Sequence, residues 1–250
     1  MNGDLTAIQN EMVRPGRTLV FLDETEFQGN EVPDLAPDLR VVVGLKMASD
    51  HYSEVQSKMA ERLQWLATNE FHATEILNPK KGSSWRHVEL SERIEAFNLL
   101  STLIAQTDAS MRYAWISKGD YLQIRERMRS EGHVAGRLNR NTALKRFALR
   151  SLLKELQEEG RPAAVFVDQD RPRKSIELDR SEKALWLLGG GVLTSPSHLL
   201  HGLQLADALA FGIGRRFRKR HNLDSSNASE LDEAAIGPLA ALDGRSSSLF

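Results

Sequence analysis

Two short apolar segments of this chain each end in an aspartate, and this repeated pattern is the first indication of chemistry. Residues 18–22 (TLVFL) lead into Asp23 and Glu24, and residues 163–167 (AAVFV) lead into Asp168. Apolar runs without Gly or Pro indicate strands that are buried on both faces. An acid at the carboxyl end of such a strand lies where open α/β sheets form their ligand crevices. Taken alone, Asp23 and Glu24 are explained equally well as the start of a polar loop.

Strand alternation predicts the direction of these acids. Asp23 should share a face with Phe21, and Glu24 should point to the opposite face in a supporting or structural role. If the two strands are parallel neighbours, Asp23 and Asp168 meet at one end of the sheet. Two ionised carboxylates that are close together repel each other and lose hydration unless a cation lies between them. A hard divalent ion that prefers oxygen ligands, Mg²⁺ or Mn²⁺, would offset both the repulsion and the lost hydration.

The third candidate acid is Asp207. Between residues 198 and 214 it is the only Asp or Glu, and this apolar, helical segment contains no Lys or Arg. A lone carboxylate on a largely buried helix costs free energy unless it has a partner. The alternative is an exposed aspartate on a narrow polar stripe shared with His201 and Gln204.

The segment from Glu70 to Glu75 (EFHATE) supplies the fourth acid and a histidine. Either glutamate could reach the cluster, and Glu75 is preferred because it precedes Ile76 at the expected end of an element. A surface acid near a helix start explains Glu75 equally well. His72 titrates near neutral pH and could pass protons to a leaving group, although a structural histidine is the favoured interpretation.

Charge and composition limit the remaining possibilities. The chain has 33 basic and 34 acidic residues among 250, so any polyanion binding must come from local clusters rather than from overall charge. The basic residues just after Asp168 are the best placed to contact a phosphate near a metal: Arg171, Arg173 and Lys174. Residues 215–221 are also basic, but cations at a helix end are explained at least as well by the helix dipole.

Several enzyme classes are excluded by missing residues. The chain has no Cys, which excludes thiolate metal sites and cysteine nucleophiles. It also lacks a P-loop, an HExxH motif and a nucleophile elbow. Thr25 stands where an aspartyl phosphatase would have a second Asp. No apolar run approaches the roughly 20 residues of a membrane span, and the first residues lack the apolar core of a secretory signal, so a cytoplasmic protein is expected.

Strand and helix patterns alternate along the chain, which predicts an α/β fold. Strands are expected at 39–48 and 111–116, and helices at 52–68, 88–106 and 198–214. Residues 120–160 are expected to be helical with a break near 132–136. The expected domains are an extension over residues 1–17, one domain over 18–221 that contains this helical insertion, and a flexible tail over 222–250 that could dock a protein partner.

These motifs, in this order, resemble the family known as domain of unknown function 3800, which is similar to the ribonuclease H-like superfamily. The resemblance covers about residues 18–216, and its sharpest parts are Asp23-Glu24 and residues 203–207 (LQLAD). The family usually has Asp-Glu-Ser-Gly at the first motif, whereas this chain has Asp23-Glu24-Thr25-Glu26. The resemblance implies a mixed central β-sheet flanked by α-helices, Asp23 and Asp168 on adjacent central strands, and Asp207 on a C-terminal flanking helix.

The leading hypothesis is a nuclease that hydrolyses RNA or DNA with Mg²⁺ or Mn²⁺. Asp23 would be the ligand that bridges two metal ions, and Asp168 and Asp207 would be the flanking ligands. Glu75 would be a further ligand or would position the attacking water. His72 would be the proton donor. The alternative from another class is a non-catalytic module of the same fold that binds nucleic acid or protein, with a bacterial defence or toxin system as its setting.

Overall fold

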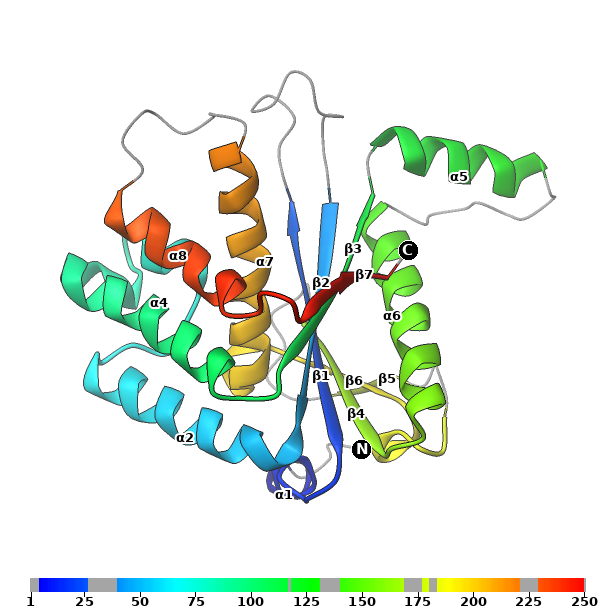
Figure 1. Cartoon of the computed structure of the whole chain (residues 1–250), viewed down its shortest axis with the longest axis horizontal. Helices are drawn as coiled ribbons and strands as arrows, with labels where there is room; N and C mark the ends of the chain where they lie inside the picture. The colour runs from blue at the N-terminus through cyan, green and yellow to red at the C-terminus, as the bar shows by residue number, and fades with distance from the viewer. Residues whose placement is uncertain are drawn as a thin grey trace.

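The computed structural model of this protein is built on a seven-stranded mixed β-sheet with helices on both faces (Figure 1). The strand order is β5-β6-β4-β1-β2-β3-β7. The structure describes residues 5–26, 40–116, 118–130, 140–168, 177–179, 184–220 and 229–249. The predicted α/β class, with a mixed sheet flanked by helices, is therefore confirmed.

The centre of the sheet is β1 (Thr18–Glu26), which has a different kind of neighbour on each side. It pairs antiparallel with β2 (Arg40–Ala48), which in turn pairs antiparallel with β3 (Ser110–Ile116). On its other side it pairs parallel with β4 (Ala163–Asp168), and Leu22 lies opposite Val167 in this pair. Asp23 and Asp168 are the next residues on the two strands. The expectation that these acids lie on adjacent, parallel strands is confirmed. Asp168 ends β4 as expected, whereas β1 continues past Asp23 to Glu26, because these residues still pair with β2.

Short strands form the two edges of the sheet. On one side β4 pairs parallel with β6 (Val192–Ser195), which pairs antiparallel with β5 (Glu177–Asp179). On the other side β7 (Ser246–Ser248) pairs parallel with β3. Segments of three or four residues carry too little alternation to be predicted from sequence, because one period of a strand already takes two residues.

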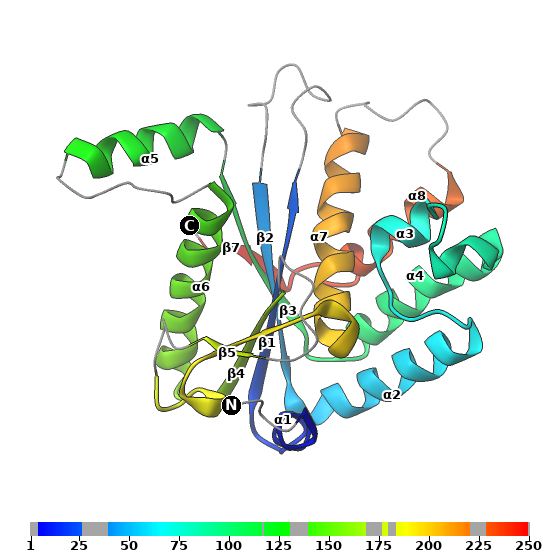
Figure 2. The ribbon, with the colours of Figure 1, turned by 180° about the vertical axis from the view of Figure 1, so that it is seen from behind.

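One face of the sheet is covered by several helices and the other mainly by one. The first face carries α2 (Ser49–Trp65), α4 (Leu90–Ala105), α7 (His201–Arg220) and α8 (Glu230–Ala240), with the short α3 (Ala73–Leu77) beside them (Figure 2). On the opposite face lies α6 (Arg140–Glu159), which follows α5 (Lys118–Ser130). None of the described helices is both long and apolar enough to cross a membrane.

The alternation of β1 divides the core between these faces. Leu19 and Phe21 belong to the cluster under α7, whereas Val20 and Leu22 belong to the cluster under α6. Burial of each such side chain contributes about 1.5–3 kcal/mol. The predicted helical insertion is part of this core, because one stripe of α6 packs on the sheet through residues four apart: Leu144, Ala148, Leu152 and Leu156.

The expected flexible tail is wrong for residues 229–249. Ser229 caps α8, accepting the backbone N–H of Asp232 at 3.2 Å, and the helix packs against α4 and α7. Leu231, Leu239 and Leu242 are buried. The acids and serines that suggested a tail belong to the first turn and the cap, while the short apolar face is buried. Residues 221–228 lie outside the described part of the chain.

The expected N-terminal extension is also part of the fold where it is described. Residues 5–12 form the helix α1, and its last residue, Met12, is buried in the main core. An eight-residue helix offers only about two turns of pattern, which is too little for its apolar face to be recognised in the sequence.

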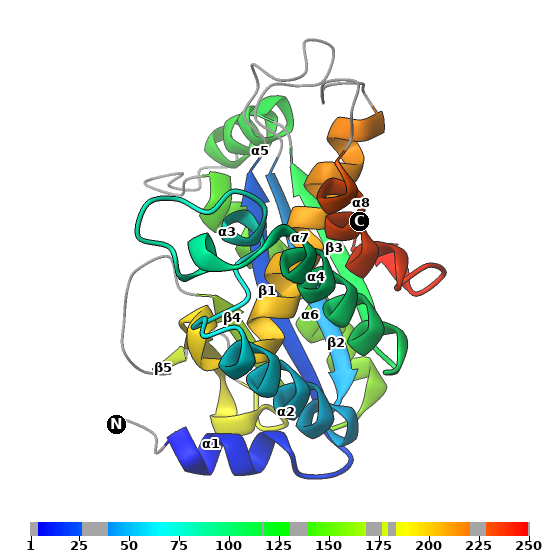
Figure 3. The same cartoon turned by 90° about the vertical axis from the view of Figure 1, so that its left-hand side faces the viewer.

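The helix α7 approaches the sheet closely because of a glycine. The ring of Phe21 stacks between Tyr52 and Phe166, with ring centroids 5.2 Å and 5.4 Å away. Gly202 lies against this ring, and a Cβ at that position would be only 2.3 Å from a ring carbon of Phe21. In the side view of Figure 3, α7 lies along β1. Gly202 therefore sets the distance at which α7 presents its later residues to the end of β1.

We expect Gly202→Ala to destabilise the protein by about 1–3 kcal/mol, because the added methyl group overlaps the Phe21 ring. A helical Gly→Ala change without such a clash would instead stabilise by roughly 0.5–1 kcal/mol. Thermal unfolding of both single variants and of the double variant Phe21→Leu, Gly202→Ala measures the coupling free energy between positions 21 and 202. A cost for Gly202→Ala that is unchanged in the Phe21→Leu background would contradict this packing account.

Candidate active site

A cavity of about 290 Å³ opens beside the last residue of β4 and the later half of β1. The structure brings together there three of the predicted acids, Asp23, Asp168 and Asp207, which come from β1, β4 and α7. The other lining residues are Glu24, Glu70, Phe71, His72, Lys145 and Ser197. Acids that are far apart in the sequence therefore share one cavity.

Asp23 is the most buried of these acids, with 9% of its surface exposed. Its Oδ1 accepts the backbone N–H of Glu24 at 2.7 Å. Burial raises the pKa of Asp23 well above its usual range, and the negative charges of Asp207 and Asp168 raise it further. Removing water from a carboxylate among like charges is costly, so a cation in this cavity would be stabilised.

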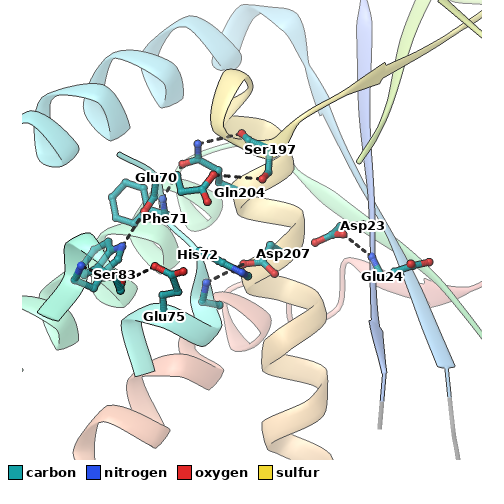
Figure 4. A network of polar contacts seen from close by, with 12 residues as sticks. Asp23, Glu24, Glu70, Phe71, His72, Glu75, Ser83, Ser197, Gln204 and Asp207 are labelled. Carbon is teal, nitrogen blue, oxygen red and sulfur yellow. Dashed lines mark hydrogen bonds and ion pairs between the residues drawn. The ribbon is translucent and has the colours of Figure 1, made fainter. Parts of the chain in front are cut away.

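Asp207 faces Asp23 across the cavity from the neighbouring helix (Figure 4). Its Oδ2 accepts the backbone N–H of Ala73 at 2.8 Å and lies 3.2 Å from Nδ1 of His72. The Asp207 side chain is only 20% exposed. It therefore does not lie on an exposed polar stripe. Gln204, which shares the polar stripe in that alternative interpretation, is buried as well.

Gln204 was missed as a residue that shapes the site. Its Oε1 accepts the backbone N–H of Phe71 at 3.0 Å, and its Nε2 donates to the carbonyl of Ser197 at 3.1 Å. These two bonds fix the segment before α3 to the segment before α7, and Figure 4 shows both. A buried amide in an apolar helix satisfies its polar groups in this way, because leaving them unpaired costs about 1–3 kcal/mol.

His72 is held in its charged form. The hydrogen bond to Asp207 raises the pKa of His72 to about 9, with further help from the charges of Asp207, Glu70 and Glu75 and against the effect of burial. At neutral pH the imidazole therefore carries both protons. Its Nδ1 faces Asp207, which leaves Nε2 as the group that can act on a ligand.

The preference for Glu75 is corrected in favour of Glu70. Glu70 lines the cavity and accepts a hydrogen bond from Ser197 Oγ at 3.3 Å. Glu75 is not among the lining residues, and it accepts a hydrogen bond from Ser83 Oγ at 2.5 Å. The extended backbone at His72 precedes α3, so Glu70 and His72 alternate with the buried Phe71. This polar–apolar–polar alternation was the signal for Glu70 in the sequence.

The two other predicted sets of residues have different outcomes. Glu24 points toward the α6 side as expected, and its Oε1 lies 3.2 Å from Nζ of Lys145. The predicted phosphate contacts, Arg171, Arg173 and Lys174, lie outside the described residues. In the basic segment after residue 214, Arg215 pairs with Asp232 of α8 at 3.4 Å, which favours a structural role for that arginine.

The acids do not form a preassembled metal site. Within the described part of the chain, no three Asp, Glu or His side chains converge as a ligand set for a metal ion. One oxygen of Asp207 is already engaged by His72 and Ala73. The cavity thus has the carboxylate oxygens that hard divalent ions prefer as ligands, and one of these carboxylates, Asp207, is already paired with His72.

Comparison of the chain with protein-family models, curated proteins and solved structures gave no match. The functional argument therefore depends on the geometry and charge of the cavity.

We expect Asp23→Asn to stabilise the metal-free protein. Because the folded-state pKa of Asp23 lies above its unfolded value, ionisation of Asp23 costs stability as the pH rises through the folded-state pKa. The amide removes that charge and keeps an oxygen to accept the Glu24 N–H. The melting temperature should exceed that of the wild type, by roughly 2–4 °C for each kcal/mol gained.

Thermal melts in EDTA between about pH 4 and about pH 9 test this, since the gain should grow with pH. The exposed Asp243→Asn is the control, and it should change stability by less than about 0.5 kcal/mol at every pH. An Asp23→Asn variant that is less stable than the wild type at the alkaline end would contradict the assignment of a strained carboxylate.

Proposed function

We propose that this protein is a metal-dependent nuclease of ribonuclease H-like fold that hydrolyses phosphodiester bonds of RNA or DNA. The observation that carries the proposal is the meeting of Asp23, Asp168 and Asp207 in one cavity, with Asp23 buried among the other two charges. A structural cluster of like charges would be unfavourable without a cation, whereas a metal-dependent active site requires such a cluster.

The arrangement of elements supports the ribonuclease H-like assignment. The resemblance implied a mixed sheet with two acids on adjacent central strands and a third on a later flanking helix. β1 and β4 are adjacent and parallel in the middle of the mixed sheet. Asp207 lies on α7, which packs against β1.

The donor chemistry of the cavity fits Mg²⁺ or Mn²⁺. Asp23, Asp168, Asp207 and Glu70 offer only carboxylate oxygens, which are the ligands that these ions prefer. When bound, such ions would activate the attacking water and stabilise the negative charge on the departing oxygen. The buried carboxylate of Asp23 is the group whose desolvation a cation would offset most.

His72 has the proton that the leaving group needs. In the hydrolysis, the oxygen of water forms a bond to phosphorus and gives up a proton to solvent, and the bond from phosphorus to one ester oxygen breaks. That oxygen takes a proton from Nε2 of His72, whose charged form the neighbouring carboxylates of Glu70 and Glu75 also favour, and His72 then regains a proton from solvent. The products are one end with a phosphate monoester and one end with a free hydroxyl group.

We expect the purified protein to cleave labelled RNA or DNA with Mn²⁺ or Mg²⁺ at neutral pH. Asp168→Asn and Asp207→Asn should each lower kcat/KM by at least about 100-fold, because each removes a charge that the transition state requires. Glu70→Gln should also lower it. The matched control is Glu75→Gln, which lies in the same segment but outside the cavity lining and should remain within about threefold of wild type.

Cleavage that persists in both aspartate variants would show that another site is responsible. Isothermal titration with Mn²⁺ separates the alternative function. A wild-type protein that binds no Mn²⁺ at neutral pH would favour the non-catalytic binding module.

A further inference from the structure

The cavity that holds the three aspartates also contains a lysine from the opposite side of the sheet. Lys145 lies on α6, one residue after the buried Leu144 and on the same stripe as the partly buried Leu149 and Leu153. Because Lys145 is near the start of α6, its side chain reaches the end of the sheet at which Glu24 and Asp168 lie. The side chain is only 17% exposed.

Glu24 holds this lysine at the cavity. Val20 and Leu22 of β1 point toward α6, and Glu24 is the next residue in that alternation. Its Oε1 lies 3.2 Å from Nζ of Lys145, and its own side chain is 21% exposed. The apolar cluster that β1 shares with α6 is thus followed by an ion pair at the rim of the site. Adjacent acids on β1 serve the two faces of the sheet, with Asp23 on the α7 side and Glu24 on the α6 side.

A negatively charged phosphodiester can bind beside the acids of this cavity only if a positive side chain is also present. Among its lining residues in the described part of the chain, the acids are Asp23, Glu24, Glu70, Asp168 and Asp207, and the cations are Lys145 and His72. Carboxylates repel a phosphodiester, so a positive group beside them favours its approach. The positive charge of Lys145 also acts on the acids, since it opposes the rise in the pKa of Asp23 that burial causes.

We propose that Lys145 contacts a phosphate of the substrate beside the aspartates, and that Glu24 is the positioning residue that holds its ammonium group there. This inference rests on the nuclease function proposed above. Lys145 would then work opposite His72, with one cation on each side of the acids. An ammonium group on a long side chain can bind a phosphate oxygen while it keeps contact with Glu24.

A purely structural ion pair is the competing explanation, and the chain provides a matched control. Lys46 of β2 also pairs with α6, at 3.3 Å from Glu155 and in contact with Glu159. Its side chain is 18% exposed, close to the value for Lys145. Lys46 lines a different cavity, together with Thr18 at the start of β1. Lys46→Gln therefore removes a similar link between sheet and helix without touching the acid cavity.

The test measures binding of a fluorescein-labelled oligonucleotide, either RNA or DNA, by anisotropy with Ca²⁺ in place of Mn²⁺ to prevent cleavage. Lys145→Gln should weaken binding by about tenfold or more, the value of one lost charged contact. It should also reduce the slope of log K against log salt by roughly 0.7–0.9, the change expected for one phosphate contact. Lys145→Arg should recover most of the affinity, Glu24→Gln should lose less than Lys145→Gln, and Lys46→Gln should match the wild type.

Metal affinity provides an independent readout. Mn²⁺ binding to Lys145→Gln should be at least as tight as binding to the wild type, because a positive neighbour of the carboxylates has been removed. A structural defect would weaken both metal and oligonucleotide binding. Near-UV circular dichroism and melting temperatures show whether each variant is folded. If Lys145→Gln does not fold, Lys145→Arg is the variant to be compared with the wild type.

Unchanged oligonucleotide binding in Lys145→Gln, or equal losses in Lys145→Gln and Lys46→Gln, would overturn the assignment of Lys145. A wild-type protein that binds Mn²⁺ but neither RNA nor DNA would overturn it as well, while leaving the metal site intact. If the wild type binds the oligonucleotide through Lys145 but never cleaves it with Mn²⁺, the nuclease function fails and the phosphate contact stands.

Discussion

The burial of the Asp23 carboxylate in the later half of the central strand is the constraint on which the rest of the site depends. A charge in that position is unfavourable by itself, and Asp168 and Asp207 make it more so. Folding brings these acids together because β1 and β4 are parallel neighbours and because Gly202 lets α7 approach Phe21 closely. The packing that stabilises the core thus creates an electrostatic cost in the cavity. Such a cost is typical of sites that bind a cation or perform acid–base chemistry.

The site is balanced by one cation on each side of the sheet. His72 reaches Asp207 from the segment before α3, and Lys145 reaches Glu24 from α6. The alternation of β1 makes this possible, because adjacent acids at the end of a strand point to opposite faces. These two ion pairs partly neutralise Asp207 and Glu24. A divalent ion bound at the proposed site would compete with His72 for Asp207, which would couple metal binding to the position of the histidine.

The central part of the site was predictable from local patterns, and the remainder was not. An apolar run that ends in an acid does not by itself distinguish Asp23 from the start of a loop. The repeat of the pattern at Asp168 and the lone acid Asp207 in an apolar helix together predict the cluster. The sequence favours Glu75 over Glu70 because Glu75 precedes Ile76 at the expected end of an element, whereas the first residues of the segment are extended and alternate about Phe71. Lys145 gave no local signal, since its role depends on where α6 meets the sheet. Residues 230–240, within the expected tail over 222–250, form a helix that the sequence pattern does not reveal because its buried face is short.

The central claim is that Asp23, Asp168 and Asp207 together bind a divalent ion, and anomalous diffraction from crystals soaked in Mn²⁺ tests it most directly. The account predicts an anomalous peak in contact with carboxylate oxygens of Asp23 and Asp168, with Asp207 turned from His72 toward the ion. A peak elsewhere on the protein, or none while the His72–Asp207 pair remains in place at saturating Mn²⁺, would contradict it.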